Sequence, residues 1–196
     1  MKRIEALETL VSLTDQHPVV VTCAATSREL ASVKDRDNHL YLLDAMGLAG
    51  SVATGLALTV TPSAPKVVAI EGDGSLLMNP NVLTTGGYLA PDNLLLVLLD
   101  NRVYGSTGAL PTYASKIDLE QLAVSAGWTT RAADTVQELK AAFRELLTVP
   151  GPAFLYARIE TGNAPGIAKL LIDPVAITIR FTHWLRENHA VAEAAA

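Results

Sequence analysis

The sequence contains a single cysteine, Cys23, among 196 residues. One cysteine excludes an internal disulfide and any cysteine-rich zinc site. The chain also lacks an excess of basic residues, since 15 Lys and Arg face 20 Asp and Glu for a net charge of −5. This balance excludes a general electrostatic footprint for nucleic acid. Its longest purely apolar runs, such as residues 94–99, fall far short of the roughly 20 residues that a membrane span needs, so we expect no membrane partner.

The N-terminal segment, residues 1–13, is charged and amphipathic and has no small-residue cleavage site. It is therefore not a signal peptide, and we expect a cytoplasmic protein. Hydrophobic residues make up 49% of the chain, which is ample for a buried core and argues against disorder. With no internal repeat and no long linker, we expect one domain over residues 1–196.

Apolar runs alternate with segments of helical pattern. Continuous apolar runs are typical of strands buried on both faces. Strands are expected at residues 19–21, 39–43, 66–71, 94–99 and 153–159. Helices are expected at residues 46–58, 75–89, 119–126, 135–147 (with Asp134 as N-cap) and 174–188, before a frayed end at 192–196. This alternation predicts a single doubly wound α/β domain with a mostly parallel sheet and helices on both faces, in which ligands bind at the carboxyl ends of the strands.

Two consecutive predicted strands end in polar residues. One leads into Gly72, Asp73, Gly74 and Ser75, and the next leads into Asn101. Right-handed crossovers bring such loops together at one edge of the sheet. The Asp73 carboxylate and the Asn101 amide oxygen are hard ligands of the type that Mg²⁺ takes while it also holds phosphates. The glycines allow close backbone approach, and the start of the next helix favours an anion.

The segment Gly72-Asp73-Gly74-Ser75, followed by residues 100–104, resembles the diphosphate and Mg²⁺ signature of thiamine-diphosphate (ThDP) enzymes. The resemblance covers most of the chain but only the C-terminal, pyrophosphate-binding (PP) domain of that family. Further stretches are similar to sulfopyruvate decarboxylase beta subunits and to the C-terminal part of phosphonopyruvate decarboxylases. These stretches are residues 27–30, 33–36, 46–49, 72–79, 104–108 and 173–177.

The resemblance implies roles for individual positions. Asp73, the Asn101 side chain and the Val103 carbonyl would bind Mg²⁺. Met46 would be the apolar wedge that bends the cofactor into a V shape; a core methionine that fills a gap is the other reading of this residue. The remaining implied cofactor contacts are Gly72, Gly74, Ser75 and Tyr104, with Thr26 and Ser27 at the first strand end and Asp44 in the aminopyrimidine stretch.

Some positions depart from the family pattern. Asp100 stands where many ThDP enzymes have the first Asn of a pair, and residues 108–112 lack an expected Gly-Gln. The missing Gln puts the substrate in doubt rather than the cofactor. A sulfonate or phosphonate group would need cations, for which Arg28 and Arg102 are candidates, although each could equally be a solvated charge.

The resemblance also implies that part of the active site lies elsewhere. ThDP enzymes of this type activate the cofactor with a glutamate on a pyrimidine-binding (PYR) domain, and the sequence has length for only one domain of the pair. We assign no catalytic residue here and expect a separate PYR-domain subunit in a hetero-oligomer of dimers. The expected function is one subunit of a ThDP- and Mg²⁺-dependent 2-oxo acid decarboxylase, a carbon–carbon lyase of the sulfopyruvate or phosphonopyruvate type.

Two alternatives remain open at this stage. A split carboligase of the acetolactate-synthase kind would share the cofactor site and differ in the acceptor. A non-catalytic nucleotide-binding or regulatory α/β subunit would bind NAD or ATP without ThDP. The sequence speaks against the second, because it has neither GxGxxG after a strand nor a GxxxxGK[ST] motif.

Overall fold

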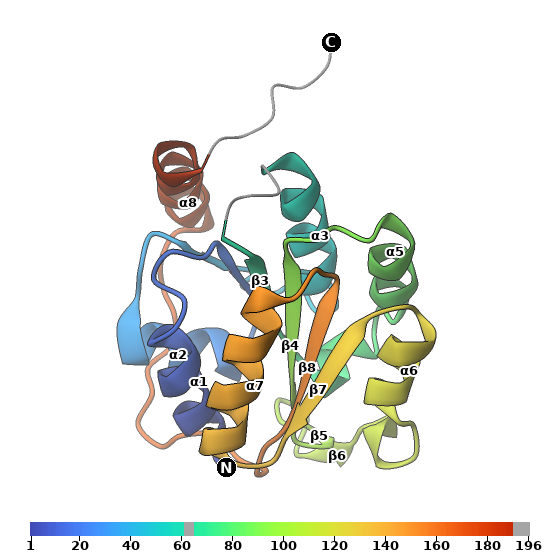
Figure 1. The fold of residues 1–196 in the computed structure, drawn as a ribbon. Helices are drawn as coiled ribbons and strands as arrows, with labels where there is room; N and C mark the ends of the chain where they lie inside the picture. The colour runs from blue at the N-terminus through green and yellow to red at the C-terminus, as the bar shows by residue number, and fades with distance from the viewer. Residues whose placement is uncertain (61–64, 190–196) are drawn as a thin grey trace.

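A computed structural model describes residues 1–60 and 65–189. At its centre is a six-stranded parallel sheet (Figure 1). The strands lie in the order β2-β1-β3-β4-β8-β7, and every neighbouring pair is parallel. Their bounds are β1 Val19–Val21, β2 His39–Tyr41, β3 Val67–Gly72, β4 Leu94–Asp100, β7 Thr129–Ala133 and β8 Ala153–Arg158. The predicted doubly wound α/β fold is confirmed.

The two longest apolar runs form the centre of the sheet. All residues of β4 are buried, as are Val67 to Glu71 in β3, because both faces of these strands are covered by helices. Successive side chains of β3 enter different cores: Val68 and Ile70 pack on one side and Val67 and Ala69 on the other. This alternation follows from the two-residue period of a strand.

Helices cover both faces of the sheet. One core receives side chains from α1 Arg3–Val11, α2 Ala25–Lys34 and α7 Val136–Thr148. The opposite core receives them from α3 Ala49–Thr59, α5 Asn81–Leu89 and α6 Leu119–Ser125. The last described helix, α8 Pro174–Asn188, packs beside β2 and contributes to both cores. No helix among the described residues is long and apolar enough to cross a bilayer.

The structure corrects several predicted boundaries. The crossover segment 75–89 is two helices, α4 Asp73–Leu76 and α5, because Pro80 cannot continue a helix and instead precedes α5 as its N-cap. The predicted helix 46–58 begins only at Ala49, after Gly47 adopts a φ of +74°. The expected frayed end at 192–196 lies outside the described residues.

Elsewhere the structure replaces one predicted cap and adds three strands. The N-cap of α7 is Thr135 rather than Asp134, because the Thr135 hydroxyl accepts the Glu138 N–H in a capping box. Strand β7 was not predicted, since its sequence is polar, as suits an edge. The hairpin β5 Val103–Tyr104 and β6 Leu110–Pro111, followed by the short helix η1 Tyr113–Ser115, was also not predicted.

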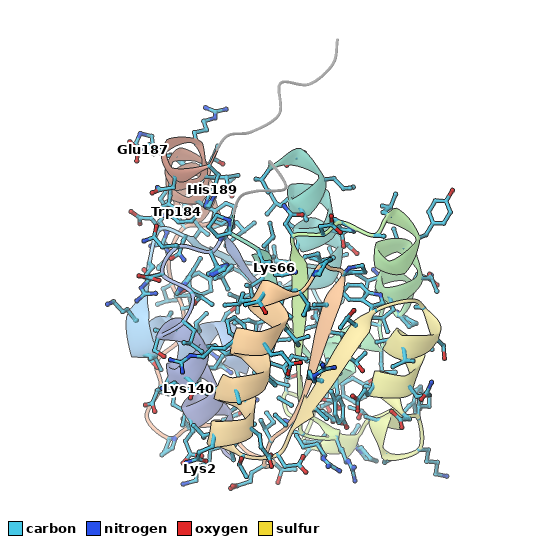
Figure 2. All side chains as sticks on the ribbon, in the orientation of Figure 1. Lys2, Lys66, Lys140, Trp184, Glu187 and His189 are labelled. Carbon is cyan, nitrogen blue, oxygen red and sulfur yellow. The ribbon has the colours of Figure 1, made fainter. Side chains whose placement is uncertain are left out.

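The carboxyl ends of the strands gather at one end of the molecule. The hairpin that follows β4 and the N-terminus both lie there, at the lower end in Figure 1. In Figure 2 the side chain of Lys2 marks this end, and Lys66, which precedes β3, lies well above it. This placement brings the start of the chain close to the loops that leave β1, β3 and β4.

Candidate functional site

A cavity of about 140 Å³ lies where β1, β3 and β4 end. It is bordered by the β1–α2 loop, the β3–α4 junction, the β4–β5 connection and three more distant residues, Arg3, Met46 and Asn163. The lining residues that matter below are Thr26, Arg28, Met46, Gly72, Asp73, Gly74, Ser75, Asn101, Val103, Tyr104, Arg3 and Asn163. The sheet therefore brings together most of the residues that the sequence singled out, from segments up to 78 positions apart, Thr26 to Tyr104.

Asp73 lies at the centre of this arrangement and is 2% exposed. Its Oδ2 accepts a hydrogen bond of 2.6 Å from the Thr112 hydroxyl, and its Oδ1 accepts the Asn101 N–H at 3.4 Å. Burial, with a smaller contribution from the nearby charge of Asp100, raises the pKa of the Asp73 carboxyl to about 6, and the hydrogen bond from Thr112 opposes the rise. A cation beside this carboxylate would reverse both effects, so the position favours a bound cation.

Asn101 and Val103 line the cavity together with Asp73. The Asn101 Oδ1 accepts the Val103 N–H at 3.0 Å, which holds the amide in a tight turn at the end of β4. A carboxylate, an amide oxygen and a backbone carbonyl make a hard donor set that fits Mg²⁺. The described residues contain no group of three or more His, Cys, Asp or Glu that could hold a metal. A Mg²⁺ ion held by these oxygens would complete its coordination with water and phosphate oxygens.

Asp100 is turned away from the cavity. Its Oδ1 accepts the Arg102 N–H at 2.8 Å, and its Oδ2 accepts the Tyr156 hydroxyl at 2.5 Å. These two bonds hold the buried carboxylate in place. Burial raises the pKa of the Tyr156 phenol, and the hydrogen bond to Asp100 adds to that rise. The departure from the family pattern at position 100 thus leaves Asp73 and Asn101 in place.

Two glycines shape the loop under the cavity. A Cβ on Gly74 would stand 2.6 Å from the ring of Tyr104, so only glycine fits beneath that ring. A Cβ on Gly72 would meet nothing within 4 Å, which leaves the backbone there open to the cavity. Because residue 74 has no side chain, the Tyr104 ring can pack against it and line the cavity.

The Ser75 hydroxyl, in the lining of the cavity, is hydrogen-bonded to three other residues from β3 and two loops. It donates to the Glu71 carboxylate, accepts the Gly47 N–H at 2.7 Å and lies 2.8 Å from the Thr22 hydroxyl. Burial raises the pKa of Glu71, and hydrogen bonds from Ser75 and Thr22 oppose that rise. This junction ties the loop of Met46, which lines the cavity, to the loop of Asp73. No local pattern marks this junction, because Thr22 and Gly47 reach Ser75 from separate segments of the chain.

The other predicted positions divide into two groups. Thr26 and Arg28 line the cavity, whereas Ser27 and Asp44 do not. The Ser27 hydroxyl donates to the Thr22 carbonyl at 2.5 Å, and Asp44 is exposed. Arg102 is exposed and lines a separate cavity with Lys116 and Arg158. The structure therefore does not bring Ser27, Asp44 or Arg102 to the cavity wall.

Sequence reasoning missed several residues of the site. Arg3 and Asn163 line the cavity from α1 and from the segment after β8, and Thr112 reaches Asp73 from beyond the hairpin. Ala24, at the end of β1, has a φ of 64° and a ψ of −130°, a strained backbone for a residue with a side chain. No motif marked these residues, because each depends on long-range packing.

The sequence matches a known protein family and is similar to two decarboxylases. Residues 21–157 match the family model of the thiamine pyrophosphate enzyme C-terminal TPP binding domain. The chain is 38% identical to sulfopyruvate decarboxylase subunit beta of Methanothermobacter thermautotrophicus, over 95% of this chain and 96% of that protein. It is also 38% identical to phosphonopyruvate decarboxylase of Streptomyces viridochromogenes, over 91% of this chain but 45% of that protein.

A solved structure shares the fold. Benzoylformate decarboxylase from Polynucleobacter necessarius superposes with a TM-score of 0.70 and 21% identity, over 84% of this chain and 34% of that one. At this identity the likeness concerns the fold alone. The chain spans about a third of that enzyme and about half of the phosphonopyruvate decarboxylase.

Proposed function

The chain belongs to the thiamine pyrophosphate (ThDP) enzymes, because residues 21–157 match their C-terminal TPP binding domain. On that premise we propose that it is the diphosphate- and Mg²⁺-binding subunit of a 2-oxo acid decarboxylase. The substrate would be of the sulfopyruvate or phosphonopyruvate type, the activities named for the relatives that are 38% identical. The described residues share one sheet with a core on each face, which supports treating residues 1–196 as one PP domain.

The observation that carries the proposal is the convergence of Asp73 and Asn101. They follow adjacent parallel strands, β3 and β4, and the Asn101 N–H lies 3.4 Å from the Asp73 carboxylate. These two side chains and the Val103 carbonyl would hold Mg²⁺, which in turn would bind diphosphate oxygens. The open backbone at Gly72 leaves room for a ligand to approach.

Bound ThDP would supply an electron sink for the carbon that loses carbon dioxide. The residues of this chain hold and orient that group. Asp73 and Asn101 would fix its charged end, and Met46 would present an apolar surface to its rings. The buried junction around Ser75 keeps the Met46 loop and the Asp73 loop at a fixed separation, so that the two ends of the cofactor are positioned together.

We place the activating glutamate on a separate PYR-domain subunit. The relative that this chain covers over 96% of its length is named a subunit beta, which supports a heteromer. The two glutamates near the cavity are already engaged: Glu71 is bound by Ser75, and Glu29 is bound by Arg3. Neither glutamate lines the cavity, which supports an outside source for that carboxylate.

Calorimetric titration tests this proposal. ThDP is titrated into the purified chain with and without Mg²⁺, alone and with the co-purified partner subunit. We expect Mg²⁺-dependent binding that tightens with the partner and is abolished by Asp73→Ala. Absence of binding with both Mg²⁺ and partner, or unchanged affinity in Asp73→Ala, would refute the proposal. Product analysis with sulfopyruvate, phosphonopyruvate and pyruvate then separates the decarboxylase from a carboligase, which would release acetolactate from pyruvate.

A further inference from the structure

Arg3 is a buried arginine in the wall of the cofactor cavity. It extends from the first turn of α1 and is 7% exposed, yet it lines the same cavity as Asp73, Gly74 and Asn101. Neither the metal site nor the junction around Ser75 uses it. A buried cation costs free energy unless its surroundings compensate it, so its neighbours indicate what it does.

Three groups hold the guanidinium through one nitrogen. Arg3 Nη2 donates to Glu29 Oε1 at 2.7 Å, to Asn163 Oδ1 at 2.6 Å and to the Gly162 carbonyl at 3.2 Å. The same Glu29 oxygen also accepts the Ala164 N–H at 3.1 Å. Helices α1 and α2 and the segment after β8 thus fix the side chain in one orientation before any ligand arrives.

The rest of this ion pair is incompletely satisfied. Arg3 Nε and Glu29 Oε2 are both buried and have no hydrogen-bond partner in the part of the chain that the structure describes. All three hydrogen bonds that the guanidinium donates to described residues come from Nη2. An arginine carries five N–H donors in a planar fork that matches the oxygens of a phosphate. Nη1 makes no hydrogen bond to the described residues and, unlike Nε, is not enclosed, so Arg3 keeps its Nη1 donors for an anionic ligand in the cavity.

We propose that Arg3 binds the terminal phosphate of the cofactor diphosphate, on the side away from the Met46 loop. This inference rests on the proposed ThDP function. A diphosphate together with the Asp73 carboxylate carries more negative charge than one Mg²⁺ cancels, so a further cation in the wall is favourable. Among the described residues that line the cavity, Arg3 and Arg28 are the basic ones.

Arg3 is better prepared for this role than Arg28. Arg28 is half-buried, and its Nε donates to the Ala24 carbonyl of its own helix at 3.3 Å. Arg3 is already held by Glu29 and Asn163, so little side-chain entropy is lost when a ligand binds. Arg102, the other arginine considered from the sequence, lines a different cavity.

The experiment compares ThDP with thiamine monophosphate, which lacks the terminal phosphate, by calorimetry at saturating Mg²⁺ on the chain with its partner subunit. We expect Arg3→Gln to weaken ThDP binding by at least about tenfold and thiamine monophosphate binding much less. Arg131→Gln is the matched control, because it removes the same charge from an exposed pair with Glu145 outside the cavity; it should bind both compounds as the parent does.

Folding is controlled separately, since Arg3→Gln leaves Glu29 buried without its partner. The double variant Arg3→Gln/Glu29→Gln removes both charges and should show the same selective loss, with thermal melts to confirm the fold. Unchanged ThDP affinity in both variants would overturn the inference, as would an equal loss for the two compounds. So would unchanged ThDP affinity combined with a selective rise in KM for sulfonate or phosphonate substrates. Failure of the parent itself to bind ThDP would instead refute the proposed function.

Discussion

Thr112 gives the sharpest test of how the proposed metal site is built. Its hydroxyl donates to Asp73 Oδ2 at 2.6 Å, and both residues are 2% exposed. Thr112 would not itself contact the metal, so a change there acts through Asp73. We predict that Thr112→Val, which replaces the hydroxyl with a methyl group of similar size, weakens Mg²⁺-dependent ThDP binding.

The magnitude follows from the geometry of that bond. A hydrogen bond to a charged group contributes about 1.5–3 kcal/mol, and this one is short and shielded from water. Burial already raises the pKa of Asp73 to about 6, so losing a donor to the ionised form raises that pKa further. The carboxylate is then a poorer and less well oriented ligand. The apparent Mg²⁺ affinity should fall by roughly tenfold to a hundredfold, the range seen when groups that orient metal ligands are removed.

The assay is a titration of Mg²⁺ at fixed ThDP, read by calorimetry on the chain with its partner subunit. Thr112→Ser is the matched control, since it keeps the hydroxyl and should stay within about threefold of the parent. Thermal melts without metal check that both variants fold. Equal Mg²⁺ dependence in Thr112→Val and the parent would refute the reasoning, because Asp73 would then be held adequately by the Asn101 N–H alone.

Two further predictions concern stability. Burial, with a smaller contribution from the charge of Arg36, lowers the pKa of His39 from 6.5 to about 4. As the pH falls, the unfolded chain therefore takes up the His39 proton before the folded chain does. About 3 kcal/mol of the free energy of unfolding should be lost between pH 6.5 and pH 4. Urea denaturation measures this loss, and an equally steep profile in His39→Gln would contradict it. Gly74→Ala should destabilise the chain by about 1–3 kcal/mol, because its methyl would lie 2.6 Å from the Tyr104 ring, whereas Gly72→Ala meets nothing within 4 Å; equal melting temperatures for the two variants would show that Tyr104 yields freely.

The sequence was sufficient to predict the centre of the sheet and the edge that carries the site. Residues 94–99 are wholly apolar, and only a strand covered on both faces buries such a short run completely. Right-handed crossovers then put Asp73 and Asn101 at the same edge. These inferences needed only local pattern and connectivity, which is why the structure places both residues on one cavity.

Other features were beyond local pattern. Strand β7 has the sequence of residues 129–133, with two threonines and an arginine, and its polarity suits an edge strand as well as a loop. Arg102 sits next to Asn101 in the sequence, but its φ of 61° belongs to the left-handed region. With the backbone turned in this way, the side chain lines a different cavity from its neighbour. Adjacency to Asn101 in the sequence therefore did not place the Arg102 side chain at the same cavity.

The residues that support the proposed metal and phosphate positions are placed in a different way from the proposed ligands, Asp73 and Asn101. Asp73 and Asn101 are set by the backbone at strand ends, whereas Thr112 arrives 39 residues after Asp73 through a hairpin, and Arg3 meets Asn163 across 160 residues. Such contacts depend on how whole elements pack, and no period in the sequence encodes them. Yet these partners govern the charge and orientation of the groups that a ligand would meet. A family motif can therefore locate a cofactor, while the strength of its binding is decided by residues that the motif does not contain.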